Sequence, residues 1–381
     1  MAQQSTETSN EPGVADDRIL LATIMDYTGP NREFGLHGIA GLKSALHRIN
    51  SHGGVYGRRI ELVEYDHASD PSRVPALARK VVEEDRAFAA IFNFGAEQMV
   101  TVKDYFTARK FPNLFPGSMG NVWFHSGRYH LSDCIPQSDM AVLVIDHLVQ
   151  QRRAGRIALI HQDCESGRNA LAATRERMRL HGRSLAVEVG FDYEVARAGG
   201  DLKADAERAA KSGADAVFIF AESHSAAKML GNIRALGWKP EIILAPNSTW
   251  NTTIELAREA AEGVFGMTMY PLPLDPGYLM SLYREDMRQN FPELKLGALS
   301  TFGYIKGILF AEAARRVGYR LTRERLLESL ESIHDFDPGL GYTYGFGGPD
   351  NRTLARSARL MIVKEGSWQA HGAWVDLRAR A

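Results

Sequence analysis

Serine and histidine side chains are the first candidates for catalysis or metal binding, but their spacing supports neither. Ser118 lies in the segment PGSMG, which resembles the G-x-S-x-G elbow of hydrolases without matching it. The closest histidine pairs are His47 with His52 and His125 with His130, each five residues apart. That spacing does not place two ligands on one face of a helix. We expect Ser118 to be a polar loop residue and the four histidines to be solvated or loop residues.

Sequence motifs that bind phosphates, dinucleotides or metals do not occur. There is no G-x-x-x-x-G-K-[ST] segment, and the loop after the first apolar run is DYTGPNREFG instead of G-x-G-x-x-G. Neither H-E-x-x-H nor C-x-x-C is present. The sequence therefore predicts a protein that is not an enzyme and that needs no cofactor and no metal.

Length and charge narrow the class of protein further. The chain of 381 residues is too long for one ordinary core and suits two domains of roughly 150–190 residues. Its 45 basic and 46 acidic residues give a net charge of −1, which does not favour binding to nucleic acid or to an anionic membrane. No apolar run is long enough to span a bilayer. A small molecule or another protein is the expected partner.

The start of the chain and the two cysteines do not decide in which cellular compartment the protein lies. Residues 1–17 are polar, lack the pattern of a secretory signal and are predicted to form a disordered leader. Either the protein is cytoplasmic, or this is a mature form whose signal peptide has been removed. Cys134 and Cys164 exclude a disulfide-rich scaffold, and they can pair in an oxidising compartment or stay free.

Short apolar runs alternate with amphipathic stretches along most of the chain. Leu36, Ile39, Leu42, Leu46 and Ile49 form the apolar stripe of one expected helix. This alternation predicts βαβ units and parallel sheets. The expected strands are 18–25, 59–66, 89–94, 111–116, 156–161, 184–190, 215–221, 241–245 and 263–269, and the clearest helices are 167–181, 223–236, 299–317 and 322–333, followed by a hairpin around Glu365-Gly366.

The order of these segments resembles the type I periplasmic solute-binding proteins of ABC transporters, in the leucine/isoleucine/valine-binding branch. The segments that carry the resemblance, in family order, are YTGPNREFGLHGIAGLKSALHRINSHGGVYGRRIELVEYDHASDP, FGAEQMVTVKDYFTARKFPNLFPGS, KSGADAVFIFAESHSAAKMLGNIRALGWKP, EGVFGMTMY and TFGYIKGILFAEAARRVG. The resemblance runs from about Arg18 to the C-terminus.

This resemblance implies an α/β fold of two doubly wound, Rossmann-like lobes joined by a three-strand hinge that closes on a ligand. The crossings would fall near Gln137, Met269–Tyr270 and Ser357. The N-terminal lobe would then comprise residues 18–136 and 270–356, and the C-terminal lobe residues 137–269 and 357–381.

The resemblance also places the ligand residues. The first loop would bring two aromatic side chains to the apolar part of the ligand, and two later loops would bind its carboxylate. In these later loops Ala96 replaces the family's serine and Met119 its threonine, so Ser118 is the expected hydroxyl donor. The residues implied for the three loops are Tyr27, Phe34, Phe94, Gly95, Ala96, Glu97, Gly117, Ser118 and Met119.

The acids that hold the ligand's ammonium in amino-acid binders fall on uncharged residues here. One position is Gln137 and another is Asn247, and neither can offset a buried ammonium. Glu222 can replace those acids, or it can be an exposed residue at a helix start. Trp250, Tyr270, Phe302 and Tyr304 are possible aromatic walls, although core packing is the alternative for each and is favoured for Tyr304.

The function implied is a periplasmic receptor that captures a small hydrophobic or aromatic carboxylate, or an amino-acid-like metabolite, and delivers it to an ABC transporter permease. The alternative is a cytoplasmic amide or amino-acid sensor of the same fold that regulates gene expression. Neither function requires nucleic-acid binding by this chain or insertion into a membrane.

Overall fold

The computed structural model describes residues 11–377, which divide into two compact units. The first unit comprises the chain up to Cys134 together with Pro276–Arg356, and the second comprises Ile135–Asp275 and Ser357 onward. Residues 135–136 and 270–275, which the sequence-based boundaries placed with the first unit, belong to the second. One reason is that the Arg359 guanidinium donates a hydrogen bond to the buried Asp275 carboxylate.

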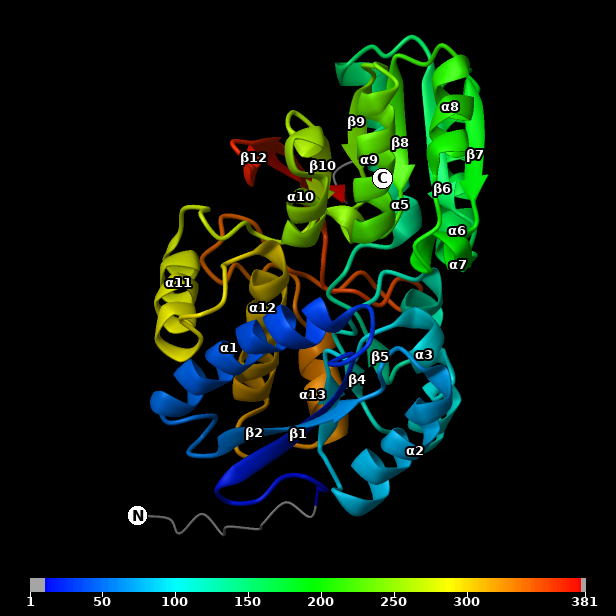
Figure 1. Ribbon diagram of the computed structural model, residues 1–381. Helices are drawn as coiled ribbons and strands as arrows, with labels where there is room; N and C mark the ends of the chain where they lie inside the picture. Colours follow the sequence, from blue (N-terminus) through cyan, green and yellow to red (C-terminus); the bar gives the residue numbers. More distant parts are fainter. Residues whose placement is uncertain (1–10, 378–381) are drawn as a thin grey trace. The chain divides into compact units, whose positions relative to one another are not determined.

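The first unit contains a parallel sheet in the strand order β2-β1-β3-β4-β5. The order reverses between β1 and β3, and helices cover both faces, which makes the unit doubly wound (Figure 1). Its strands are β1 (Arg18–Met25), β2 (Arg59–Asp66), β3 (Ala89–Ile91), β4 (Asn113–Leu114) and β5 (His130–Leu131). Its helices of five residues or more are η1 (Phe34–Gly38), α1 (Ile39–Ser51), α2 (Val74–Arg79), η3 (Lys80–Glu84), α3 (Ala96–Val100), α4 (Lys103–Ala108), η4 (Asn121–His125), α11 (Tyr278–Asn290), α12 (Ala298–Val317) and α13 (Arg323–Glu331).

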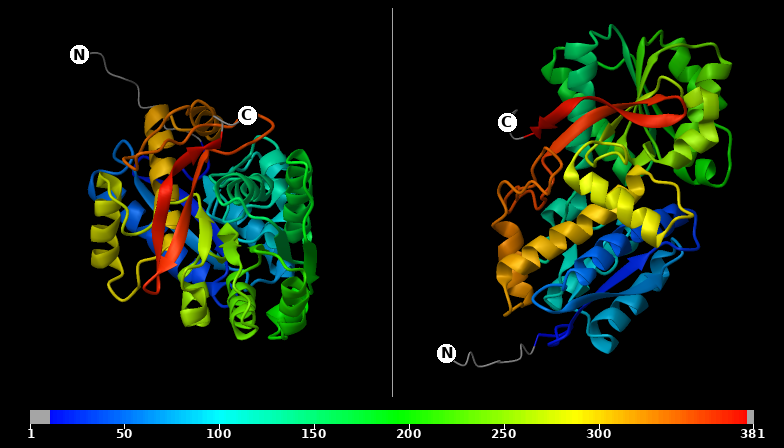
Figure 2. Two further views of the ribbon diagram at one scale, coloured as in Figure 1. Left: turned by 90° about the horizontal axis from the view of Figure 1, so that it is seen from above. Right: turned by 90° about the vertical axis from the view of Figure 1, so that its left-hand side faces the viewer.

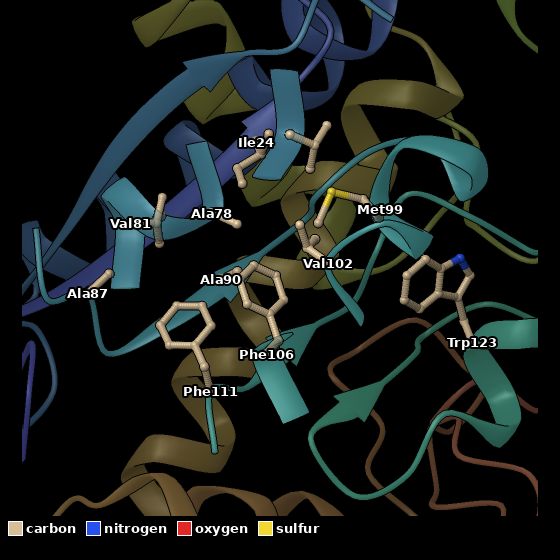
Figure 3. Close-up of a cluster of buried hydrophobic side chains, with 12 residues drawn as sticks. Ile24, Ala78, Val81, Ala87, Ala90, Met99, Val102, Phe106, Phe111 and Trp123 are labelled. Carbon is tan, nitrogen blue, oxygen red and sulfur yellow. The ribbon is translucent and has the colours of Figure 1, made fainter. Parts of the chain in front are cut away.

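Apolar side chains from β1, β3, α2 and α4 form a core of the first unit, to which Trp123 also belongs (Figure 3).

The helices α1 and α12 of the same unit approach each other so closely that only glycine fits at the contact. A Cβ on Gly41 would lie 1.9 Å from the carbonyl oxygen of Ser300, and a Cβ on Gly303 would lie 1.8 Å from that of Gly38. Because η1 leads directly into α1, this packing fixes the position of Phe34 relative to α12.

The second unit has a mixed sheet in the order β12-β11-β10-β9-β8-β6-β7. Its parallel part reverses between β6 and β8, so this unit is also doubly wound. The strands are β6 (Ile157–Gln162), β7 (Val187–Phe191), β8 (Ala216–Phe220), β9 (Glu241–Leu244), β10 (Phe265–Thr268), β11 (Ser357–Lys364) and β12 (Ser367–Asp376). The helices of five residues or more are α5 (Gln137–Asp146), η5 (His147–Gln151), α6 (Glu165–Leu180), α7 (Tyr193–Arg197), α8 (Lys203–Lys211), α9 (Ser223–Ala235) and α10 (Asn251–Ala257).

The predicted hairpin is confirmed as β11 and β12, which Figure 2 shows as a long twisted ribbon. Lys364 pairs with Ser367, so Glu365 and Gly366 form a two-residue loop, and both have positive φ angles of 53° and 66°. These angles are typical of the type I′ turn, whose twist matches that of the flanking strands.

Several sequence-based expectations for the first unit are wrong. Residues 11–17 are ordered, since Val14 bridges Ile19 and the Arg58 side chain donates to the carbonyl of Ala15 at 2.7 Å; residues 1–10 lie outside the described part. Leu36 is 54% exposed and is not part of the apolar face of a helix. The strand predicted at 89–94 ends at Ile91 because Phe92 has a φ angle of 57°.

A buried carboxylate in the second unit gives its stability a specific pH dependence. Asp146 accepts hydrogen bonds from Arg177 at 2.6 and 2.7 Å and from His181 at 2.8 Å. Burial acts to raise the pKa of Asp146, but the bonds from Arg177 and His181 hold it below its ordinary value. A carboxylate with a lowered folded-state pKa stabilises the fold above its unfolded pKa, and this contribution is lost as the pH falls through the folded-state value.

We therefore expect Asp146→Asn to lower the free energy of unfolding at pH 7 by about 2 kcal/mol, the range for hydrogen bonds to charged groups. The difference between variant and wild type should begin to shrink below about pH 4, where this carboxyl is protonated in the unfolded chain, and should be lost as the pH falls through the lowered folded-state pKa. Urea unfolding at pH 7, 5 and 3 measures this. A difference that stays constant from pH 7 to 3 would contradict the assignment.

Candidate functional site

In the first unit, the loops that follow β1, β3 and β4 meet at the carboxyl edge of the sheet. The amide of Phe94 donates to the carbonyl of Ile24 at 3.0 Å, and that of Gly117 donates to the carbonyl of Asn93 at 2.7 Å. Phe94 and Gly117 also form a parallel bridge. The reversal of strand order between β1 and β3 lies between two of these loops, and ligands of open α/β sheets bind at such a point.

Asp26 shapes the loop after β1. This buried carboxylate accepts the amides of Gly29 at 2.6 Å and Asn31 at 2.9 Å, together with the hydroxyl of Ser69. Tyr27 is half-buried, and its hydroxyl donates to the Glu64 carboxylate at 2.6 Å. Burial and this carboxylate raise the pKa of Tyr27. The Tyr27 hydroxyl is thus committed to Glu64, and the ring is the part of the side chain that a ligand can use.

The predicted aromatic contacts of the first unit do come together. The rings of Phe34 and Phe94 lie 4.1 Å apart between centroids. Phe34 is buried, whereas Phe94 is half-exposed. His67 contacts the Phe94 backbone, since its Nε2 lies 3.2 Å from the carbonyl oxygen of Phe94. Burial lowers the pKa of His67 and so favours the neutral ring at this position.

Ser118 and Ala96 lie on the same side of Gly120. A Cβ placed on Gly120 would lie 3.4 Å from the Cβ of Ala96 and 3.5 Å from the Ser118 hydroxyl. The Ser118 oxygen accepts the Gly120 amide at 3.3 Å, a bond that leaves the hydroxyl proton free for a ligand acceptor. Ser118 and Met119 are half-exposed, and Glu97 is exposed beside Gly95, which has a φ angle of 93°.

Phe302 and Tyr304 occupy the interior of the first unit. Phe302 is 3% exposed and meets Phe92 edge to face, with centroids 4.9 Å apart. Tyr304 donates its hydroxyl to the buried carboxylate of Asp286 at 2.6 Å, as expected of a core residue. His130 corrects the expectation that the histidines are solvated or loop residues, because it is fully buried in β5 and burial lowers its pKa to about 4.

In the second unit, most of the predicted residues follow the carboxyl ends of three strands, and one begins a helix. Glu222 follows β8, Asn247 and Trp250 follow β9, and Tyr270 follows β10. Gln137 is the first residue of α5, and α5 with η5 leads to the amino end of β6. A helix that runs back to the start of a parallel strand begins at the opposite, carboxyl edge of the sheet. These residues therefore share one edge of the second unit's sheet.

Uncharged acceptors are present at that edge. Within residues 11–377, the Oε1 of Gln137 and the Oδ1 of Asn247 are buried and accept no hydrogen bond. Glu222, by contrast, accepts the Tyr193 hydroxyl at 2.9 Å, and its amide donates to Gln162 at 3.0 Å. Since buried polar groups are normally hydrogen-bonded, the two free acceptors mark positions where a ligand group or water is needed.

Ser223 is a candidate that the sequence analysis missed. It is 2% exposed, and its hydroxyl has no hydrogen-bond partner among the described residues. The signal was present in the sequence, because a serine that begins a helix shortly after a buried strand lies at the edge where such folds bind ligands. Trp250 and Tyr270 are buried at 6% and 3% exposure, and the carbonyl of Trp250 accepts the indole N–H of Trp368 at 3.4 Å.

No group of three or more histidine, cysteine or acidic side chains within residues 11–377 is arranged to hold a metal ion. Cys134 and Cys164 do not form a disulfide bond. A search of the same residues for a helix long and apolar enough to cross a membrane finds none.

Comparison with known proteins decides the family. Residues 19–367 match the model of the periplasmic binding protein family. The chain belongs to this family. Its solved neighbours include a branched-chain amino acid ABC transporter protein from Thermus thermophilus with bound valine, at a TM-score of 0.83, 17% identity, and coverage of 95% of this chain and 97% of the other. A fatty acid ABC transporter substrate-binding protein from Thermomonospora curvata gives a TM-score of 0.83, 21% identity, and coverage of 97% and 94%.

Sequence relatives of this periplasmic binding protein match over a shorter part of the chain. The Leu/Ile/Val-binding protein of Escherichia coli K12 is 23% identical over 253 residues, which cover 66% of this chain and 67% of the relative. An amino acid binding protein of Pseudomonas aeruginosa is 24% identical over 222 residues, and the match spans 58% of each chain. The chain is thus a solute-binding protein of the type I class and not an enzyme, and the α/β fold predicted for it is confirmed.

Proposed function

We propose that this periplasmic binding protein is the receptor of an ABC importer in the periplasm, and that its ligand is a small hydrophobic or aromatic carboxylate or an amino-acid-like metabolite. The ligand would be passed to a membrane permease. Support comes from family membership and from relatives whose names include amino acid, leucine and fatty acid binding. The named ligands differ among relatives, so the ligand class has to be argued from the residues of this chain.

The observation that carries the ligand class is the absence of charge at Gln137 and Asn247. Their buried side-chain oxygens accept no hydrogen bond within the described residues, and neither group can neutralise an ammonium ion. Glu222 is an acid that follows β8 at this edge, but the Tyr193 hydroxyl and other groups already contact it. We infer that the ligand presents no ammonium to the second unit, and that a neutral donor of the ligand or of a bridging water meets the two acceptors.

In the first unit, the proposed ligand contacts are an aromatic surface and one hydroxyl donor. Phe34, Phe94 and the ring of Tyr27 would contact the apolar part of the ligand, and Ser118 would donate to its carboxylate. The further contacts proposed in this unit are Gly95, Ala96, Glu97, Gly117, Met119 and Phe302. Those proposed in the second unit are Gln137, Glu222, Asn247, Trp250 and Tyr270, to which we add Ser223.

The test of the proposed function is a thermal-shift screen of hydrophobic carboxylates, aromatic acids, primary amides and α-amino acids. A bound ligand stabilises the folded state by about 2.7 kcal/mol at 100 times its dissociation constant, which raises the melting temperature. We expect hits among compounds that lack an ammonium group. Hits confined to α-amino acids would contradict the ligand class, and consumption of a hit by the protein would contradict the receptor function.

For a carboxylate hit, Ser118→Ala should weaken binding about tenfold or more, because a hydrogen bond to a charged group contributes roughly 1.5–3 kcal/mol. The melting temperature without ligand should not change, since Ser118 is half-exposed and its bond to the Gly120 amide is a long one. Calorimetric titration measures the affinity. Ser281→Ala, on an exposed serine of the same unit, is the control. Equal affinities for the two variants would show that Ser118 does not contact the ligand.

A further inference from the structure

The first unit encloses an ion pair that no solvent reaches. The ammonium of Lys306, on α12, lies 2.6 Å from the Asp133 carboxylate, and both side chains have zero exposure. Burial lowers the pKa of Lys306 and raises that of Asp133, while their mutual attraction opposes both shifts. Burying such a pair is costly and often contributes nothing to stability compared with apolar side chains of similar size. A role for the pair therefore has to be sought in what it contacts.

Lys306 contacts two aromatic rings in addition to Asp133. Its Nζ lies 3.5 Å from the centroid of Phe302 and 4.7 Å from that of Phe92. Both distances are within the range of a cation–π interaction, which is strongest where water is excluded. The two rings also meet each other edge to face at 4.9 Å. The ammonium thus holds Phe92 and Phe302 in one fixed arrangement.

Phe92 is an unusual residue for its position. Its φ angle of 57° is costly for a bulky side chain, and such a conformation persists only where the surroundings enforce it. Those surroundings are close: a Cβ on Gly38 would lie 2.9 Å from the Phe92 ring, and a Cβ on Gly117 would lie 3.0 Å from it. The ring is therefore clamped by η1 and by the loop after β4, in addition to α12.

The backbone next to Phe92 continues directly into the proposed ligand loops. The amide of Phe92 donates to the carbonyl of Leu114 at 3.0 Å, and the carbonyl of Asn93 accepts the amide of Gly117 at 2.7 Å. Phe94 then forms a parallel bridge with Gly117, and its ring lies against that of Phe34, tilted by 33°. Residues 94–98 begin two positions after Phe92, and residues 117–119 begin at Gly117, which lies close to the Phe92 ring. Both segments to which we assign carboxylate binding therefore begin next to Phe92.

We propose that Lys306 and Asp133 are positioning residues for ligand binding, and that the buried pair holds Phe92 and Phe302 so that residues 94–98 and 117–119 keep their ligand-binding geometry. This inference rests on the proposed function, which assigns the ligand contacts to those loops. Lys306 itself touches no ligand and acts only through the two rings.

The experiment is hydrogen–deuterium exchange, read by mass spectrometry, on the Asp133→Leu/Lys306→Met double variant without any ligand. Replacing both partners by apolar side chains avoids leaving an unpaired buried charge, so we expect the melting temperature to stay within about 4 °C of wild type. We expect peptides that cover residues 94–100 and 117–120 to exchange about tenfold faster or more, and peptides from β1 and β2 to be unchanged.

The control is Asp146→Leu/Arg177→Met, which removes an ion pair of the second unit and should leave exchange at the two loops unchanged. Wild-type exchange at the loops in the Asp133→Leu/Lys306→Met variant would overturn the proposal, as would acceleration spread evenly over the whole unit.

If the Asp133→Leu/Lys306→Met variant does not fold, Phe302→Leu tests the same positioning role with the ion pair intact. Faster exchange at the loops then supports the proposal, and unchanged exchange overturns it. Because no ligand is used, failure here is distinguishable from failure of the proposed function.

Discussion

Replacing Asn247 by Asp should reverse the ligand preference of the protein. The two side chains have nearly the same shape, so the variant changes the charge at this buried edge of the second unit and little else. A carboxylate here would repel an anionic ligand that lacks an ammonium, and it would form a charge-assisted bond with a ligand that carries one. Each effect is about 1.5–3 kcal/mol, so the affinity ratio of the two ligand classes should change by about 100-fold or more.

Calorimetric titration of wild type and variant with one ligand of each class measures this ratio. Asn232→Asp is the matched control, because it adds the same charge to α9 of the same unit, away from the carboxyl edge. An unchanged ratio in Asn247→Asp would show that Asn247 does not face the ligand. It would also remove the main reason for excluding an ammonium group from the ligand.

The same substitution, glycine to alanine within a helix, should have opposite effects at two positions. In Gly303→Ala the new methyl group would lie 1.8 Å from the carbonyl oxygen of Gly38, so α1 and α12 would have to separate. Overpacking of this kind costs about 1–3 kcal/mol or more. At Gly231, within α9, no atom lies within 4 Å of the place that a new methyl group would take. Gly231→Ala should therefore stabilise the protein by about 0.5–1 kcal/mol, the difference in helix propensity.

Chemical denaturation of both variants measures the contrast, which should reach about 2–4 kcal/mol between them. Because η1 and Phe34 precede α1 directly, Gly303→Ala should also weaken ligand binding beyond its effect on folding. Equal stabilities for the two variants would mean that the helices α1 and α12 are not packed as closely as the structure shows.

Much of the fold follows from local sequence. The apolar run 18–25 coincides with β1, because a strand buried on both faces needs no polar alternation. Asp70 and Thr322 cap their helices as their residue types predict, with Asp70 accepting the Ser72 amide and Thr322 that of Arg325. The turn at Glu365-Gly366 was also predicted, although the distant Glu262 carboxylate accepts both of its amides.

What the sequence did not predict depends on contacts between distant residues. Phe92 and Phe115 end their strands early with positive φ angles, although neither residue type favours that conformation. The strand β5 has only two residues and is defined by its pairing with β4. Lys306 and Asp133 are 173 positions apart, and no local pattern indicates that a lysine within an apolar helix is paired.

Part of the candidate site could likewise be predicted from the sequence, and part could not. Family order located Ser118, Gln137 and Asn247 in the sequence, and the structure places each at the carboxyl edge of its own unit's sheet. The free acceptors of Gln137 and Asn247 and the hydroxyl of Ser223 became visible only once the partners of every buried polar atom were known. Hydrogen-bond satisfaction depends on the whole packed unit, which a sequence pattern does not describe.

We propose that this periplasmic binding protein binds a small molecule without an ammonium group. Calorimetric titration with matched ligand pairs tests it most directly: 4-methylpentanoate against L-leucine, and 3-phenylpropanoate against L-phenylalanine, where each pair differs only in the α-amino group. We predict saturable one-to-one binding of at least one deaminated ligand, at least tenfold tighter than its amino acid. Tighter binding of the amino acid in both pairs would contradict the account.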